Sequence, residues 1–146
     1  MQSIRLILAA VALAAALAFP AAAHDGGDAD AIRHLMMHTF DKPEARLLVE
    51  PVVVEGDIAV AGWAQGDMGG RALLRRKDGH WTLVLCAGDA LKDPAALAQL
   101  GLTPEAAARL AAAVVAAEAA VDPATVAKFS LFEGMVMMDE HGHHPQ

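Results

Sequence analysis

The chain has 146 residues, a formal net charge of −7 and one cysteine. The negative charge argues against a nucleic-acid partner or an anionic membrane surface, because both repel an acidic protein. The length suits one domain with one hydrophobic core. A single cysteine cannot form a disulfide within its own chain, so Cys86 needs a separate explanation.

The first 23 residues have the order of a cleavable secretory signal peptide. Arg5 precedes an apolar run over residues 6–19, and Pro20 and three alanines follow. Positive, apolar and small residues in this order are typical of a signal peptide. The apolar run is shorter than the roughly 20 residues that cross a bilayer, and no positive residues follow it. We therefore predict a periplasmic protein that begins at His24 after cleavage and has no membrane anchor.

The next segment has the pattern of an amphipathic helix that Asp28 or Asp30 caps and that ends near Phe40. Residues at helical spacing form its predicted buried stripe: Ile32, Leu35, Met36, Thr39 and Phe40. The opposite side of the helix falls about half a turn away and is predicted to be exposed. That side carries His34, Met37 and His38.

Four strand-like runs follow the helix, at residues 45–54, 57–65, 71–77 and 80–86. Asp78-Gly79 predicts a tight hairpin between the last two runs, because both residues tolerate positive φ. The glycine-rich residues 66–70 are predicted to connect the second run to the third. Three basic residues share one face of the third run and are predicted to balance acidic residues at the protein surface: Arg71, Arg75 and Lys77. The runs together predict an antiparallel meander.

The rest of the chain is rich in alanine and contains three helix starts. Asp93-Pro94, Thr103-Pro104 and Asp122-Pro123 each place a capping residue before proline. The predicted fold is α+β, with an N-terminal helix on a four-stranded antiparallel meander, followed by an alanine-rich helical C-terminal section. We expect a single domain over residues 24–134 and a mobile Met/His-rich tail over residues 135–146.

Possible copper ligands lie near the predicted mature N-terminus. His34 and His38 have the i, i+4 spacing that brings two imidazoles to one metal ion, and Met37 adds a thioether suited to Cu(I). Cleavage before His24 would place an amine beside an imidazole, a pair that chelates Cu(II). The alternatives are the polar face of an amphipathic helix and a histidine that merely follows the signal.

Further possible ligands lie in the last strand and in the predicted tail. Cys86 closes the fourth strand, where it is a buried apolar group, a Cu(I) ligand or one half of an intermolecular disulfide. The predicted tail contains both soft thioether ligands and borderline imidazole ligands, which favours copper binding. The alternative interpretation of the tail is a solvated terminus without a metal. Its candidate ligands are Met135, Met137, Met138, His141, His143 and His144.

Five segments resemble a known family: EGDIAVAGWAQG at residues 55–66, GGRALLRR at 69–76, DGHW at 78–81, LCAGDAL at 85–91 and FSLFEG at 129–134. In these segments the chain is similar to the copper uptake system-associated proteins, a family of small bacterial periplasmic proteins. The resemblance extends from about Asp30 to the tail. It implies an accessory factor in copper acquisition, with a copper transporter or an outer-membrane receptor as a partner.

Motifs of common enzyme classes are absent from the sequence. There is no Gly-x-Ser-x-Gly elbow, phosphate loop or His-Glu-x-x-His, which argues against hydrolase and nucleotide functions. We therefore predict a non-enzymatic periplasmic protein that binds Cu(I) or Cu(II) and captures or delivers it for an uptake system.

Two alternatives to this function stay open. One is a binding module in which the helix and sheet form a pocket for a small molecule or partner protein, with the histidines incidental. The other is an oxidative copper enzyme, which requires His24 and another imidazole at one metal ion.

Overall fold

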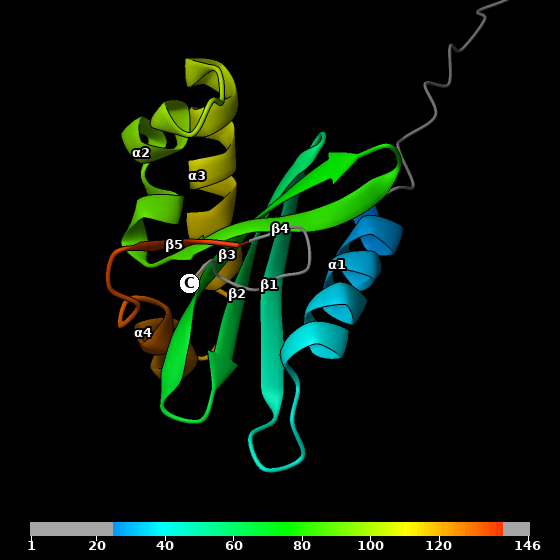
Figure 1. Cartoon of the computed structure of the whole chain (residues 1–146). Helices are drawn as coiled ribbons and strands as arrows, with labels where there is room; N and C mark the ends of the chain where they lie inside the picture. The colour runs from blue at the N-terminus through cyan, green and yellow to red at the C-terminus, as the bar shows by residue number, and fades with distance from the viewer. Residues whose placement is uncertain (1–24, 139–146) are drawn as a thin grey trace, which may run out of the picture.

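A computed structural model describes residues 25–138 of the chain (Figure 1). The predicted signal peptide, His24 and the three tail histidines lie outside these residues. No helix in the described part is long and apolar enough to cross a bilayer. The elements in chain order are α1 (Asp25–Phe40), β1 (Leu47–Glu55), β2 (Ile58–Gln65), β3 (Met68–Lys77), β4 (His80–Ala87), η1 (Asp89–Lys92), α2 (Pro94–Gln99), α3 (Pro104–Glu118), α4 (Pro123–Phe129) and β5 (Met135–Met137).

The strands form one antiparallel sheet in the order β1-β2-β3-β4-β5. The fold is therefore α+β, with the predicted helix and meander, and β5 adds a fifth strand beside β4. The predicted hairpin at Asp78-Gly79 is confirmed, because these residues have φ values of 52° and 78°. Both lie in the region that a type I′ turn requires.

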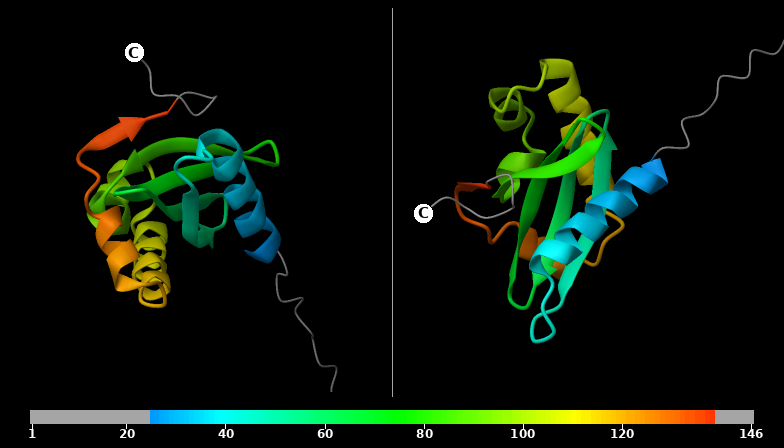
Figure 2. Two further views of the ribbon diagram at one scale, coloured as in Figure 1. Left: turned by 90° about the horizontal axis from the view of Figure 1, so that it is seen from below. Right: turned by 45° about the vertical axis from the view of Figure 1, so that its right-hand side comes forward.

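Helices cover both faces of the sheet. Successive strand residues point to opposite sides, so alternate residues of one strand pack under different helices. Ala59 and Ala61 belong to the hydrophobic cluster under α1, whereas Ile58 and Val60 belong to the cluster under α2 and α3. We call these two sides the α1 face and the α3 face. Figure 2 shows α1 crossing its face of the sheet diagonally.

The predicted helix starts in the C-terminal half are confirmed. The side chains of Asp93, Thr103 and Asp122 accept hydrogen bonds from backbone N–H groups in the first turns of α2, α3 and α4, and proline follows each cap. Such caps satisfy N–H groups that have no partner within the helix. The α1 helix differs from expectation, since it begins at Asp25 and is not capped by Asp28 or Asp30.

The glycine pair after β2 lies in a strand, not in the connection predicted over residues 66–70. Strand β3 begins at Met68, so Gly66 and Asp67 alone form the turn. A Cβ atom on Gly70 would lie 2.9 Å from Cδ2 of Phe132 and 3.0 Å from Cζ2 of Trp63. Glycine is therefore present here because two aromatic rings pack against the backbone.

The strand pattern predicted Arg71 at the surface, and this prediction is wrong, because the side chain is fully buried. Its guanidinium donates to both carboxylate oxygens of Glu118, over 2.6 and 2.9 Å, and to Asp89 over 3.1 Å. It also lies 5.6 Å from the ring centroid of Phe129. Local alternation could not reveal a carboxylate that arrives from the end of α3. These contacts tie η1, α3 and α4 to the sheet.

The folded region extends past Gly134, the predicted limit of the domain. Residues Met135–Met137 form β5, which pairs with Leu85, Cys86 and Ala87 of β4. The backbone N–H of Met138 also donates to the carbonyl of Val84 over 2.9 Å. The first residues of the predicted mobile tail are thus ordered, because the edge of β4 supplies backbone hydrogen bonds.

Candidate functional site

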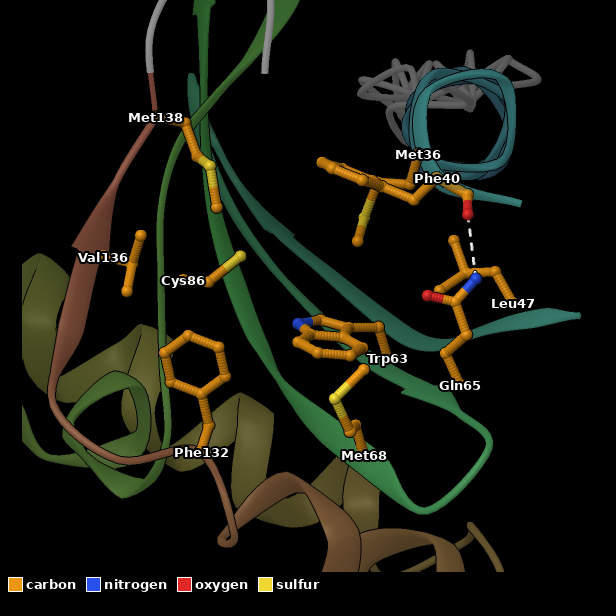
Figure 3. Close-up of a pocket in the computed structure, with 10 residues that line it drawn as sticks. All are labelled: Met36, Phe40, Leu47, Trp63, Gln65, Met68, Cys86, Phe132, Val136 and Met138. Atoms are coloured by element: carbon orange, nitrogen blue, oxygen red, sulfur yellow. Dashed lines mark hydrogen bonds between the residues drawn. The ribbon is translucent and has the colours of Figure 1, made fainter. Parts of the chain in front are cut away.

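A pocket of about 300 Å³ opens on the α1 face, between the C-terminal end of α1 and the last strand (Figure 3). Its lining is almost entirely apolar, and the one titratable side chain among the described lining residues is a cysteine. The residues that line it are Met36, Phe40, Leu47, Trp63, Gln65, Met68, Cys86, Phe132, Val136 and Met138.

Four sulfur-containing side chains from separate parts of the chain meet at this pocket. Met36 comes from α1, Met68 from β3 and Cys86 from β4, and Met138 follows β5. Met36 and Cys86 are 2% and 4% exposed, whereas Met68 is 62% exposed. Figure 3 shows the sulfur atoms of Met36, Cys86 and Met138 directed toward the space between α1 and the sheet, and Met68 beside the Trp63 ring.

Met36 is held over the sheet because both ends of α1 are anchored. Near the start of α1, Asp28 accepts hydrogen bonds from Arg76, over 2.7 and 2.9 Å, and from the Trp81 indole over 3.1 Å. At its end, the Gln65 side-chain amide donates to the carbonyl of Phe40 over 2.8 Å. The helix therefore keeps a fixed position above the pocket.

Two aromatic rings form the wall of the pocket next to the cysteine. Trp63 and Phe132 pack edge to face, with ring centroids 6.0 Å apart and planes at 80°. Phe132 reaches the α1 face because the chain after α4 passes close to Gly88, whose Cβ would lie 2.5 Å from the Phe132 carbonyl oxygen. The wall thus depends on the path of the C-terminal segment.

Burial raises the pKa of the Cys86 thiol from an ordinary value of 9.0 to about 11, and the Trp63 indole opposes this shift. Among the described residues, Trp63 Nε1 is a buried nitrogen that has no hydrogen-bond partner within normal bonding geometry. Its N–H therefore acts on the thiol through proximity and not through a well-formed bond. At neutral pH the thiol keeps its proton.

Of the α1 residues predicted as ligands, the two histidines differ from Met37 in their surroundings. His34 and His38 are exposed, as predicted. Met37 is not on the solvent side, because it is half-buried and packs against the hydrophobic cluster of the α1 face. Thr39, predicted in the buried stripe, is exposed and bonds to the carbonyl of Leu35. The helix lies flat on the sheet, so residues on both sides of Met36 contact the cluster.

The C-terminal methionines are also separated, because strand residues alternate in direction. Met138 lines the pocket, whereas Met135 and Met137 are 43% and 51% exposed. In the part of the chain that the structure describes, no three His, Cys, Asp or Glu side chains group to hold a metal ion. The pocket therefore offers a different donor set, of three thioethers and one thiol.

Met36 and Met68 are pocket residues that the sequence did not indicate as ligands. Met36 was expected in the buried stripe, where methionine commonly serves as a packing residue. Met68 was expected in a connection between strands. The one available indication was the composition, since seven methionines accompany a single cysteine.

Comparisons of the chain with protein-family models, with curated proteins and with solved structures found no match. The geometry of the pocket must therefore support any functional proposal.

Proposed function

We propose that this protein is a non-enzymatic, periplasmic copper-binding protein that captures copper or delivers it to an uptake system. The observation that supports the proposal is the gathering of four sulfur atoms, from four separate segments, around one pocket. Two of these residues, Cys86 and Met138, were already candidate ligands from sequence chemistry. Copper is the proposed cargo of the protein, not a catalytic cofactor.

The donor chemistry of the pocket favours copper over other common metal ions. Thioether and thiolate sulfur are soft ligands that select Cu(I), whereas magnesium, calcium and manganese prefer oxygen. Zinc accepts thiolates, but its sites are completed by cysteine, histidine or carboxylate, and a thioether is not among its usual ligands. The described lining residues include one cysteine and no histidine or carboxylate.

Binding, and not catalysis, also fits the described lining residues, among which Cys86 is the one titratable group. A general acid or base needs a side chain whose pKa lies near the working pH. The Cys86 thiol, with a pKa of about 11, does not meet this requirement. The chain's net charge of −7 attracts cations, and the exposed His34 and His38 are suited to a first encounter with the metal ion.

Native mass spectrometry of the exported protein, purified from cells grown with and without added copper, tests this function. We expect a chain that begins at His24 and carries copper after growth with the metal. The same spectrum reports the cleavage site and the stoichiometry. A protein that carries no copper, and gains none at micromolar Cu(I) or Cu(II), would contradict the proposal.

The shape of the pocket favours a second candidate function, the binding of a small apolar molecule. A volume of about 300 Å³ is at the lower limit of typical ligand pockets, and the lining is apolar. In that case the methionines would serve as adaptable packing residues. A small organic molecule retained in the native spectrum, without copper, would favour this function.

A further inference from the structure

We propose that the pocket is a Cu(I) site in which Met36, Cys86 and Met138 are the ligands, with Met68 as the ligand through which the ion enters and leaves. This inference rests on the proposed copper function and assigns its oxidation state, its ligands and its route. The assignment differs from the histidine sites that the sequence indicated. Of the histidines in those sites, the structure describes His34 and His38, and neither of them lines the pocket.

Three of the sulfur side chains reach the same space from independent supports. Met36 comes from an anchored helix, Cys86 from the strand β4, and Met138 from the segment that follows β5. Cys86 is paired in register with Val136, which brings Met138 to the same end of the pocket. Methionine has three rotatable side-chain bonds, so two thioethers can adjust their sulfur positions around a fixed thiol.

The charge balance within the pocket favours a monovalent ion. An isolated charge in an apolar pocket is strongly unfavourable, so a bound cation needs a partner of opposite charge. Cys86 is the one described lining residue that can become an anion. When Cu(I) binds, the Cys86 S–H bond breaks, a copper–sulfur bond forms, and one proton leaves to solvent. The thioethers are neutral, so the complex of Cu(I) with one thiolate and two thioethers has no net charge.

The surrounding residues disfavour Cu(II). Cu(II) prefers tetragonal sites of nitrogen and oxygen ligands. The Gln65 amide nitrogen is already committed to the carbonyls of Phe40 and Ala45. The Trp63 N–H is a hydrogen-bond donor and not a metal ligand. The pocket therefore offers sulfur donors within an apolar wall, which limits contact of the ion with water.

Met68 gives the site an outer ligand. Its side chain is 62% exposed yet lines the same pocket as the buried Met36 and Cys86. A thioether at the mouth of the pocket can hold Cu(I) while ligands of a partner protein replace the inner ligands. Loss of Met68 should therefore affect the rate of copper transfer more than the affinity.

Anaerobic Cu(I) titration of the full exported protein, in competition with a coloured Cu(I) chelator, tests the ligand assignment. Leucine keeps the approximate volume of methionine and removes the sulfur, so the variants are expected to fold. We expect Met36→Leu, Met138→Leu and Cys86→Ala each to weaken Cu(I) binding by at least about tenfold, since loss of a ligand should exceed the effect of losing an outer-shell partner.

Neighbouring residues provide matched controls. Met37→Leu and Met137→Leu make the same chemical change next to Met36 and Met138, outside the pocket, and should leave the affinity within about twofold of the wild-type value. Met68→Leu should slow transfer of Cu(I) to the chelator while changing the affinity by less than Met36→Leu does. Circular dichroism verifies that each variant is folded.

The results separate this inference from the proposed function. If copper binds and folded Met36→Leu, Met138→Leu and Cys86→Ala keep wild-type affinity, the ligand assignment is wrong while the copper function stands. Loss of affinity in a His34→Ala/His38→Ala variant instead would assign the ion to α1. If the wild-type protein binds no copper, both proposals fail.

Discussion

Cys86 has an environment that keeps the thiol neutral until a metal ion arrives. It is 4% exposed, and burial raises the pKa of its thiol to about 11. Because a metal ion binds the thiolate, copper binding must displace the proton, and affinity should increase with pH. The residue can therefore pack as a small apolar group in the copper-free protein and act as an anionic ligand in the complex.

The free energy of unfolding of the copper-free protein should decrease as the pH rises from 9.0 toward about 11. Below the lower value, the thiol is protonated in both states and its stabilising contribution is complete. Between the two values the unfolded chain ionises first, which favours unfolding by about 2 kcal/mol at the upper end. Urea unfolding of the wild type and Cys86→Ala should show this decrease as the difference between the two proteins, because lysine side chains titrate in the same pH range in both. Parallel pH profiles for the two proteins would contradict it.

At the scale of elements, the pocket depends on contacts that place α1 over the sheet. Gln65 is central to this placement, because its side-chain amide donates to the carbonyls of Phe40 and Ala45 over 2.8 and 2.7 Å. These two bonds fix the end of α1 and the loop before β1. Asp41 adds a third contact, because its side chain accepts a 2.7 Å hydrogen bond from the backbone N–H of Leu47. Met36 thus relies for its position on residues that are not proposed ligands of the ion.

Gln65→Leu should destabilise the protein by about 2 kcal/mol, because two part-buried carbonyls lose their donor. It should also weaken Cu(I) binding, since the end of α1 is no longer fixed. Gln99→Leu is the matched control, because Gln99 is exposed on α2, and its effect should stay within about 0.5 kcal/mol. Urea unfolding measures both values. Equal stability of the two variants would show that the Gln65 bonds do not anchor α1.

At the scale of the whole molecule, one buried arginine ties η1, α3 and α4 to the sheet. Arg71 holds Glu118 and Asp89 and lies over the Phe129 ring. Asp89 also accepts a 2.6 Å hydrogen bond from Ser130, and this bond is the main reason why the pKa of the Asp89 carboxyl group is lowered. Beyond Ser130 the chain passes to the α1 face, where Phe132 forms the pocket wall. The Arg71 cluster therefore determines the path by which the last strand reaches the pocket.

Arg71→Met should lower the free energy of unfolding by about 3 kcal/mol, because Glu118 would stay buried without its partner. Arg71→Met/Glu118→Leu should recover most of this loss, since apolar residues can replace a buried ion pair. The exposed pair of Arg109 and Glu55, at 2.6 Å, provides the comparison. Arg109→Met should cost less than about 1 kcal/mol. Additive losses in the double variant would contradict the buried-pair account.

Much of the fold could be predicted from local chemistry. The caps before Pro94, Pro104 and Pro123 and the turn at Asp78-Gly79 act within a few residues, so the sequence shows them directly. The role of Gly70 could not be predicted from its neighbours in the sequence, because it depends on Phe132, a residue more than 60 positions away. The pairing of β5 with β4 was missed for the same reason.

The candidate site was predictable only in part. The exposure of His34 and His38 and the burial of Cys86 followed from local patterns. The convergence of Met36, Met68 and Met138 did not, because it depends on the placement of α1, β3 and β5 around one space. Methionine at a buried position also has the same pattern in a sequence whether it packs or binds.

Copper X-ray absorption spectroscopy of the exported protein with one equivalent of Cu(I) tests the central claim most directly. The pocket predicts a first shell of sulfur alone, at about 2.3 Å, the length of a metal–thiolate bond in zinc sites. The sulfur count should decrease in Met138→Leu and stay the same in Met137→Leu. A first shell dominated by histidine nitrogen would contradict binding in the pocket.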